Sequence, residues 1–96
     1  MVTIGIEEVW KAAKEGMGLQ LIVEKDFESH VFVKCDNEYE IRLNKTSGDK
    51  RYTFVSDAVE RVIKIVRERD GKIEFVDNGE MKDFDGIALR LRYPAA

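Results

Sequence analysis

The feature that most constrains this chain is the alternation of apolar and polar residues in several short runs. This period-two pattern predicts strands with one buried and one solvated face, as in antiparallel sheets. In the first run Leu21 and Val23 are expected to point inward and Ile22 outward, and in the second Val31 points inward and Phe32 outward. The predicted strands cover residues 19–25, 31–35, 38–44, 51–55, 73–76 and 87–93.

Two other segments have helical periodicity, with one apolar stripe each. They cover residues 4–15 and 57–69, and Thr3 and Ser56 are the predicted N-cap residues. The first stripe holds Ile6, Val9, Trp10 and Ala13, and the second holds Ala58, Val59, Val62, Ile63 and Val66.

The predicted order of elements is therefore α-β-β-β-β-α-β-β. With 96 residues, 44% of them hydrophobic, the chain has the size and apolar content of a single domain over residues 1–96. The arrangement that buries every apolar face is an α+β two-layer sandwich. In it, two helices pack on one face of a mainly antiparallel sheet, whose first four strands form a meander.

Positive charge is concentrated in the middle of the chain. The formal net charge is −3, but residues 41–72 carry nine Lys or Arg against five Asp or Glu. Arg42, Lys50 and Arg51 lie on or beside one hairpin loop, which also contains Lys45 and the run Thr46-Ser47-Gly48. Two interpretations remain open, a phosphate-binding turn and an ordinary solvated turn.

The α-β-β-β-α order of the first 70 residues is similar to the double-stranded-RNA-binding domain. That family carries a lysine cluster at the start of its second helix, where this chain has the run Ser56-Asp57-Ala58-Val59-Glu60-Arg61. The three-stranded part also resembles the arm-binding domains of tyrosine recombinases, but Glu38 and Glu40 would repel phosphates on that face. We therefore transfer no residue role from either family.

No residue pattern in the chain indicates catalysis. His30 and Cys35 are the single histidine and cysteine, and their odd spacing puts them on opposite faces of a strand. We expect Cys35 in the core and His30 on the surface. The spacing of Asp77, Glu80, Asp83 and Asp85 does not match a calcium loop. The prediction is a non-enzymatic protein without cofactor or metal.

Two surfaces are candidates for partner binding. Ile22 and Phe32 interrupt polar faces of neighbouring predicted strands, and cross-strand pairing would bring them together. Isolated exposed apolar residues are equally ordinary, so both interpretations stay open. If the last strand is a sheet edge, its backbone offers a route to a homodimer, moderated by Arg90 and Arg92.

These observations predict a macromolecular-binding domain whose partner is another protein. Small acidic α/β chains of this kind resemble accessory proteins and inhibitors of phages and plasmids. The alternative is nucleic-acid binding through the basic hairpin at residues 42–51 and the second helix. An enzyme or ligand pocket built by dimerisation is a third hypothesis. With one cysteine, no long apolar run and no signal-peptide pattern, the predicted location is the cytoplasm, with no membrane contact.

Overall fold

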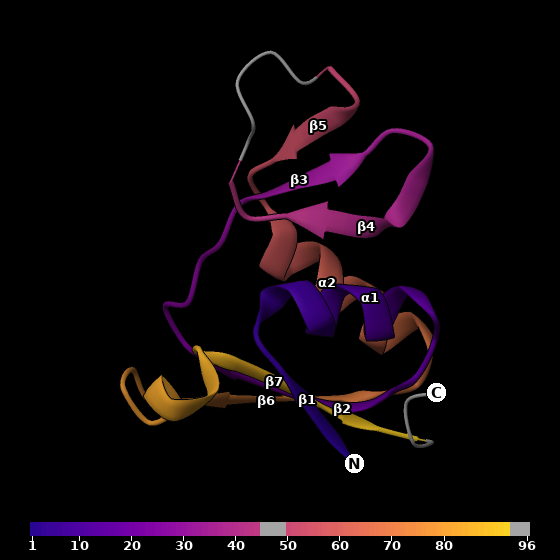
Figure 1. Cartoon of the computed structure of the whole chain (residues 1–96). Coiled ribbons are helices and arrows are strands. Elements are labelled where there is room, and N and C mark those ends of the chain that lie inside the picture. Colours follow the sequence, from indigo (N-terminus) through magenta and orange to yellow (C-terminus); the bar gives the residue numbers. More distant parts are fainter. Residues whose placement is uncertain (45–49, 93–96) are drawn as a thin grey trace.

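A computed structural model describes residues 1–44 and 50–92 of the chain (Figure 1). It confirms the α+β class and the packing of two helices on sheet, and it adds a short first strand to the predicted order. The predicted turn residues Lys45, Thr46, Ser47 and Gly48 lie outside the described residues, as does the end of the last predicted strand. The elements are β1 (Val2–Ile4), α1 (Ile6–Lys14), β2 (Gly18–Glu24), β3 (Val31–Lys34), β4 (Asn37–Arg42), β5 (Tyr52–Val55), α2 (Ala58–Glu68), β6 (Lys72–Val76), the 3₁₀ turn η1 (Lys82–Phe84) and β7 (Ile87–Leu91).

The strands form two sheets. A four-stranded sheet, here the large sheet, has the order β1-β7-β2-β6, and a three-stranded sheet, the small sheet, has the order β4-β3-β5. Only the β2–β6 pair is parallel among the described pairings, so the sheets are mainly antiparallel as predicted. Figure 1 shows α1 and α2 on one face of the large sheet, with the small sheet on their other side.

The predicted four-strand meander is wrong. The chain leaves the large sheet after β2 and enters the small sheet at β3, and β5 pairs with β3 instead of β4. Period two reports which side of a strand is buried, but it does not specify the neighbouring strand. Both sheets bury one face against the helices, so the alternation in the sequence looks the same for one sheet or two.

Helix α1 begins later than predicted, because Gly5 occupies the N-cap position with a φ of 81°. This conformation favours glycine, and Thr3 pairs with Leu89 in β1 instead of capping the helix. In α2 the N-cap residue is Asp57 and not Ser56. Both predicted stripes are nevertheless confirmed, since every member is buried except Ile63, which packs partly buried against the core.

The core lies between the two sheets and includes both helices. Leu21, Val23 and Leu89 enter it from the large sheet, while Val31 and Val55 enter it from the small sheet. The indole Nε1–H of the buried Trp10 also donates a hydrogen bond to the carbonyl oxygen of Glu38 in β4, at 2.8 Å. Trp10 therefore connects α1 to the small sheet by both packing and a polar contact.

Candidate interaction surfaces

The structure separates the two residues that were expected to form one docking patch. Ile22 pairs with Ala88 and Glu74 in the large sheet, whereas Phe32 pairs with Arg42 and Phe54 in the small sheet. The predicted Ile22–Phe32 pair is therefore wrong, because the two strands belong to different sheets. The expectation that each side chain points away from the core is met, since both are partly exposed and neither belongs to the core cluster.

Ile22 is part of an apolar row on the face of the large sheet that lies opposite the helices. Residues that pair directly share a sheet face, and the registers place Ile4, Ala88 and Ile22 side by side across β1, β7 and β2. We call these three residues the sheet-face row. Ile4 is 41% exposed, and Val2 beside it on β1 is 56% exposed. Figure 1 shows neither α1 nor α2 on this face.

Polar side chains border the sheet-face row. The next row contains Arg90 and Gln20, whose side chains are joined by a hydrogen bond of 3.0 Å from Arg90 Nη1 to Gln20 Oε1. Glu74 continues the row itself on β6. An apolar centre with a polar rim is the usual composition of a protein-binding surface.

The last strand is not a sheet edge, which corrects the predicted route to a homodimer. β7 lies between β1 and β2 and pairs with both, so its backbone is engaged on both sides. The edges of the large sheet are β1 and β6. Arg92 follows β7, and its guanidinium binds two backbone carbonyls. Its Nε donates to the carbonyl of Gly18 at 3.1 Å, and its Nη2 donates to the carbonyl of Arg69.

The outer face of the small sheet carries an aromatic cluster. The ring centroids of Phe32 and Phe54 lie 5.4 Å apart, and His30 lies 5.5 Å from Phe54 and 6.0 Å from Phe32. We call His30, Phe32 and Phe54 the aromatic face. Phe54 is 55% exposed, and His30 is exposed as predicted. Of these, the sequence pattern singled out Phe32 as an outward apolar residue but missed Phe54, because a four-residue strand offers too short an alternation.

Cationic side chains adjoin the aromatic face. Arg42 is paired with Phe32 across the strands, and its guanidinium lies 4.7 Å from the centroid of the Tyr52 ring. Lys50 and Arg51 are exposed and immediately precede β5. At the far end of β3, the Lys34 ammonium lies 3.2 Å from Glu40 and 3.9 Å from Asp36. The hydrogen bond with Glu40 raises the pKa of Lys34, and the charges of Glu40 and Asp36 add to this effect.

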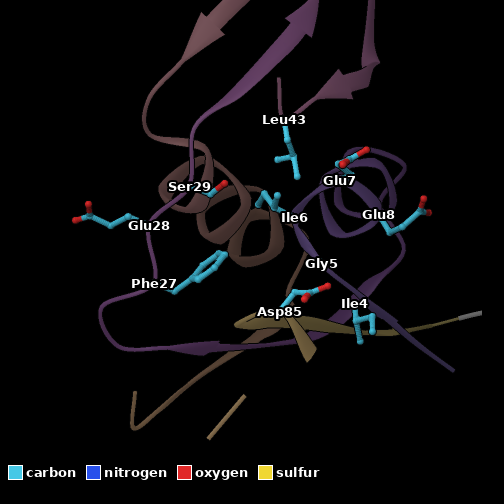
Figure 2. A pocket seen from close by; sticks show the side chains of 10 residues that line it. All are labelled: Ile4, Gly5, Ile6, Glu7, Glu8, Phe27, Glu28, Ser29, Leu43 and Asp85. Atoms are coloured by element: carbon cyan, nitrogen blue, oxygen red, sulfur yellow. The ribbon is translucent and has the colours of Figure 1, made fainter. Parts of the chain in front are cut away.

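A cleft of about 560 Å³ opens at the start of α1, between the two sheets (Figure 2). Ile6, Phe27, Leu43 and Asp85 surround its centre, whereas Glu28 points outward. No residue pattern indicates this cleft, because its walls come from four separate segments. Its lining combines apolar side chains with the carboxylates of Glu7, Glu8, Glu28 and Asp85.

Cys35 is exposed, so its predicted place in the core is wrong. It follows the end of β3, where its Sγ lies 3.3 Å from Thr53 Oγ1. Within residues 1–44 and 50–92, no group of three or more His, Cys, Asp or Glu side chains could hold a metal ion. Over the same residues, no helix has the length and hydropathy needed to cross a membrane.

The chain is similar in fold to two solved structures, a release-factor domain and a translation termination-like factor. The chain is similar to the C-terminal domain of a peptide chain release factor from Methanosarcina mazei, with a TM-score of 0.66, 22% identity, and coverage of 98% of this chain and 71% of that one. It is also similar to Dom34 of S. cerevisiae, with a TM-score of 0.61 and 18% identity, covering 98% of this chain and 22% of Dom34. At these identities the likeness shows the fold. No protein-family model and no curated protein sequence matches the chain.

Proposed function

We propose that this chain is a non-enzymatic macromolecular-binding domain that docks another protein on the open face of the large sheet. The observation that carries the proposal is the sheet-face row of Ile4, Ala88 and Ile22, which lies opposite the helices and next to the exposed Val2. Ile4 and Val2 are exposed and Ile22 is partly exposed, while Ala88 between them is buried at 3%. Apolar side chains grouped in this way inside a polar rim are a common mark of protein-binding surfaces.

The fold comparisons support the same class of function. Dom34 is described as a translation termination-like factor that is involved in RNA quality control pathways and interacts with Hbs1. A domain of this fold therefore occurs in a protein that binds another protein. By analogy we propose a partner from the translation machinery and a cytoplasmic location. An accessory or inhibitory role of the phage and plasmid type stays a prediction.

The earlier alternative, nucleic-acid binding through the hairpin and α2, receives no support from α2. Arg61 Nε lies 2.9 Å from the Asp57 carboxylate, and Lys64 lies 4.0 Å from Glu68. These pairs balance the charge along the exposed side of the helix, as expected for a solvated surface.

The test compares the wild-type chain with an Ile4→Ser/Ile22→Ser variant. A photoreactive residue at position 74, which continues the row on β6, is introduced into both chains. In the wild-type background it is expected to crosslink a discrete protein in a cell extract, and in the double serine variant this capture is expected to be lost. Phe75→Ser is the matched control, because Phe75 is 48% exposed in the same sheet and pairs with the buried Val23, so it lies on the helix side. Purified Hbs1 serves as a direct candidate partner.

Thermal unfolding of each variant separates binding from folding. The proposal requires that the double variant unfold within a few degrees of the wild-type chain while capture is lost. Equal capture by the wild-type chain and the double variant would overturn it. Loss of capture with Phe75→Ser alone would also overturn it, because the docking surface would then lie on the other side of the sheet.

A further inference from the structure

We propose that the aromatic face of His30, Phe32 and Phe54 is a stacking surface for single-stranded nucleic acid. This inference concerns a different sheet from the proposed protein-docking surface and does not depend on it. Phe32 and Phe54 are directly paired on β3 and β5, so their rings are held side by side by a backbone ladder. β3 is also the central strand of the small sheet and is paired on both sides, which fixes the position of the rings.

One ring of the aromatic face is largely open to solvent, so a ligand that stacks on it would bury apolar surface. Phe54 has 55% of its surface exposed, although it already contacts His30 and Phe32. The bases of single-stranded nucleic acids stack on aromatic side chains of this kind, and they do so with little sequence preference because every base has a π-face. The three ring centroids lie within 6.0 Å of one another, with interplanar angles of 39° to 80°, so the cluster presents ring faces and edges in different orientations to a base.

The charges beside the rings fit a polyanion. Arg42 pairs with Phe32 across the strands, and its guanidinium lies 4.7 Å from the ring centroid of Tyr52, on the strand that also carries Phe54. Lys50 and Arg51 add two exposed cations before the strand that carries Phe54. The acidic side chains of β4 and of the turn before it are engaged by lysines, because Asp36 and Glu40 lie against Lys34 and Glu38 lies 3.7 Å from Lys14 of α1. Proteins that bind single-stranded nucleic acids commonly place arginine and lysine beside the stacking rings, where these cations contact the phosphates.

The combination of paired rings and flanking cations favours nucleic acid over a protein partner. A nucleic-acid strand needs only one ring for each stacked base, and its phosphates are attracted by the adjacent positive charge.

The test measures binding of fluorescently labelled oligo(U), oligo(dT) and a DNA duplex to the full chain at low salt. We expect both single strands to bind more tightly than the duplex. Phe54→Ala should weaken single-strand binding by about 5- to 150-fold, which corresponds to the loss of one stacked base. Phe54→Tyr keeps the ring and should retain most of the affinity. Phe75→Ala removes a similarly exposed phenylalanine from the large sheet and should leave the affinity unchanged.

A second measurement tests whether Arg42 contacts a phosphate. Arg42→Gln should reduce the slope of log affinity against log salt by about 0.7, the value for one phosphate of a single strand. Thermal unfolding shows whether each variant keeps its fold. Absence of binding to every single strand at low salt would overturn the proposal and assign the aromatic face to a protein partner. Equal losses for Phe54→Ala and Phe75→Ala, or equal binding of duplex and single strands with no effect of Phe54→Ala, would also overturn it.

Discussion

Replacement of Trp10 by phenylalanine tests how the small sheet is held on the rest of the domain. Trp10 is 1% exposed, and its indole N–H donates to the Glu38 carbonyl of β4 at 2.8 Å. The Lys14 ammonium lies 5.3 Å from the ring centroid and 3.7 Å from the Glu38 carboxylate. Phenylalanine keeps an aromatic ring in the core but removes the donor and shortens the side chain.

The expected cost has two parts. Loss of the hydrogen bond leaves a partly buried carbonyl without this donor, which costs about 1–3 kcal/mol. The ring also loses roughly two carbons, and at about 0.8 kcal/mol for each buried carbon this adds about 1.6 kcal/mol. We therefore expect Trp10→Phe to destabilise the fold by about 2.6–4.6 kcal/mol, which lowers Tm by about 10–37 °C in a domain of this size.

Circular dichroism during thermal and urea unfolding measures the loss of stability. Native-state hydrogen exchange then locates it, because we expect amides of β3 and β4 to lose more protection than those of β2 and β7. Phe75→Leu is the control, since a change at a half-exposed position should stay within about 0.5 kcal/mol. A decrease in Tm below about 4 °C for Trp10→Phe, or an equal loss of protection in both sheets, would refute the reasoning.

Three further changes have defined outcomes. Gly71→Ala should destabilise by about 2 kcal/mol or more in urea unfolding, because a Cβ atom there would lie 2.4 Å from Val66 Cγ1 and 2.9 Å from the Val66 carbonyl oxygen. Arg92→Leu should cost about 1–3 kcal/mol in the same assay, since two backbone carbonyls lose a charged donor. The pKa of Lys34 is raised above its ordinary value of 10.5 by Glu40, so its stabilisation is complete below pH 10.5 and is lost as pH rises through the higher folded-state value. Lys34→Met should therefore reduce the fall of Tm at alkaline pH, as measured by circular dichroism.

The candidate surfaces were only partly predictable. The alternation in the second run identified Phe32 as an outward apolar residue, but its aromatic neighbours come from β5 and from the segment before β3. The same alternation identified Ile22, whereas Ile4 was assigned to a helix and is in fact in β1. A surface assembled from separate strands depends on their pairing, which one sequence does not display.

Two further predictions were wrong because the backbone changes direction where the residue pattern continues. Cys35 continues the apolar alternation of β3, but that strand ends at Lys34, so the thiol leaves the core. Gly5 begins α1 with a positive φ, which frees the preceding residues to form β1 against β7. As a result β7 acquires a neighbour on each side and is no longer the edge that the order of strands suggested.

Periodicity alone determined the α+β class, the two helical stripes and some of the inward strand residues, because burial of one face is a local property that the residue pattern records directly. Leu21, Val23, Val31 and Leu89 follow this rule and are fully buried. Tertiary structure decided the division into two sheets, the parallel pairing of β2 with β6, and the grouping of Ile4 with Ile22 and of Phe32 with Phe54. Strands pair through backbone N–H and C=O groups, which are the same at nearly every residue. The packing of the whole chain, and not the sequence of one segment, therefore decides which strands become neighbours.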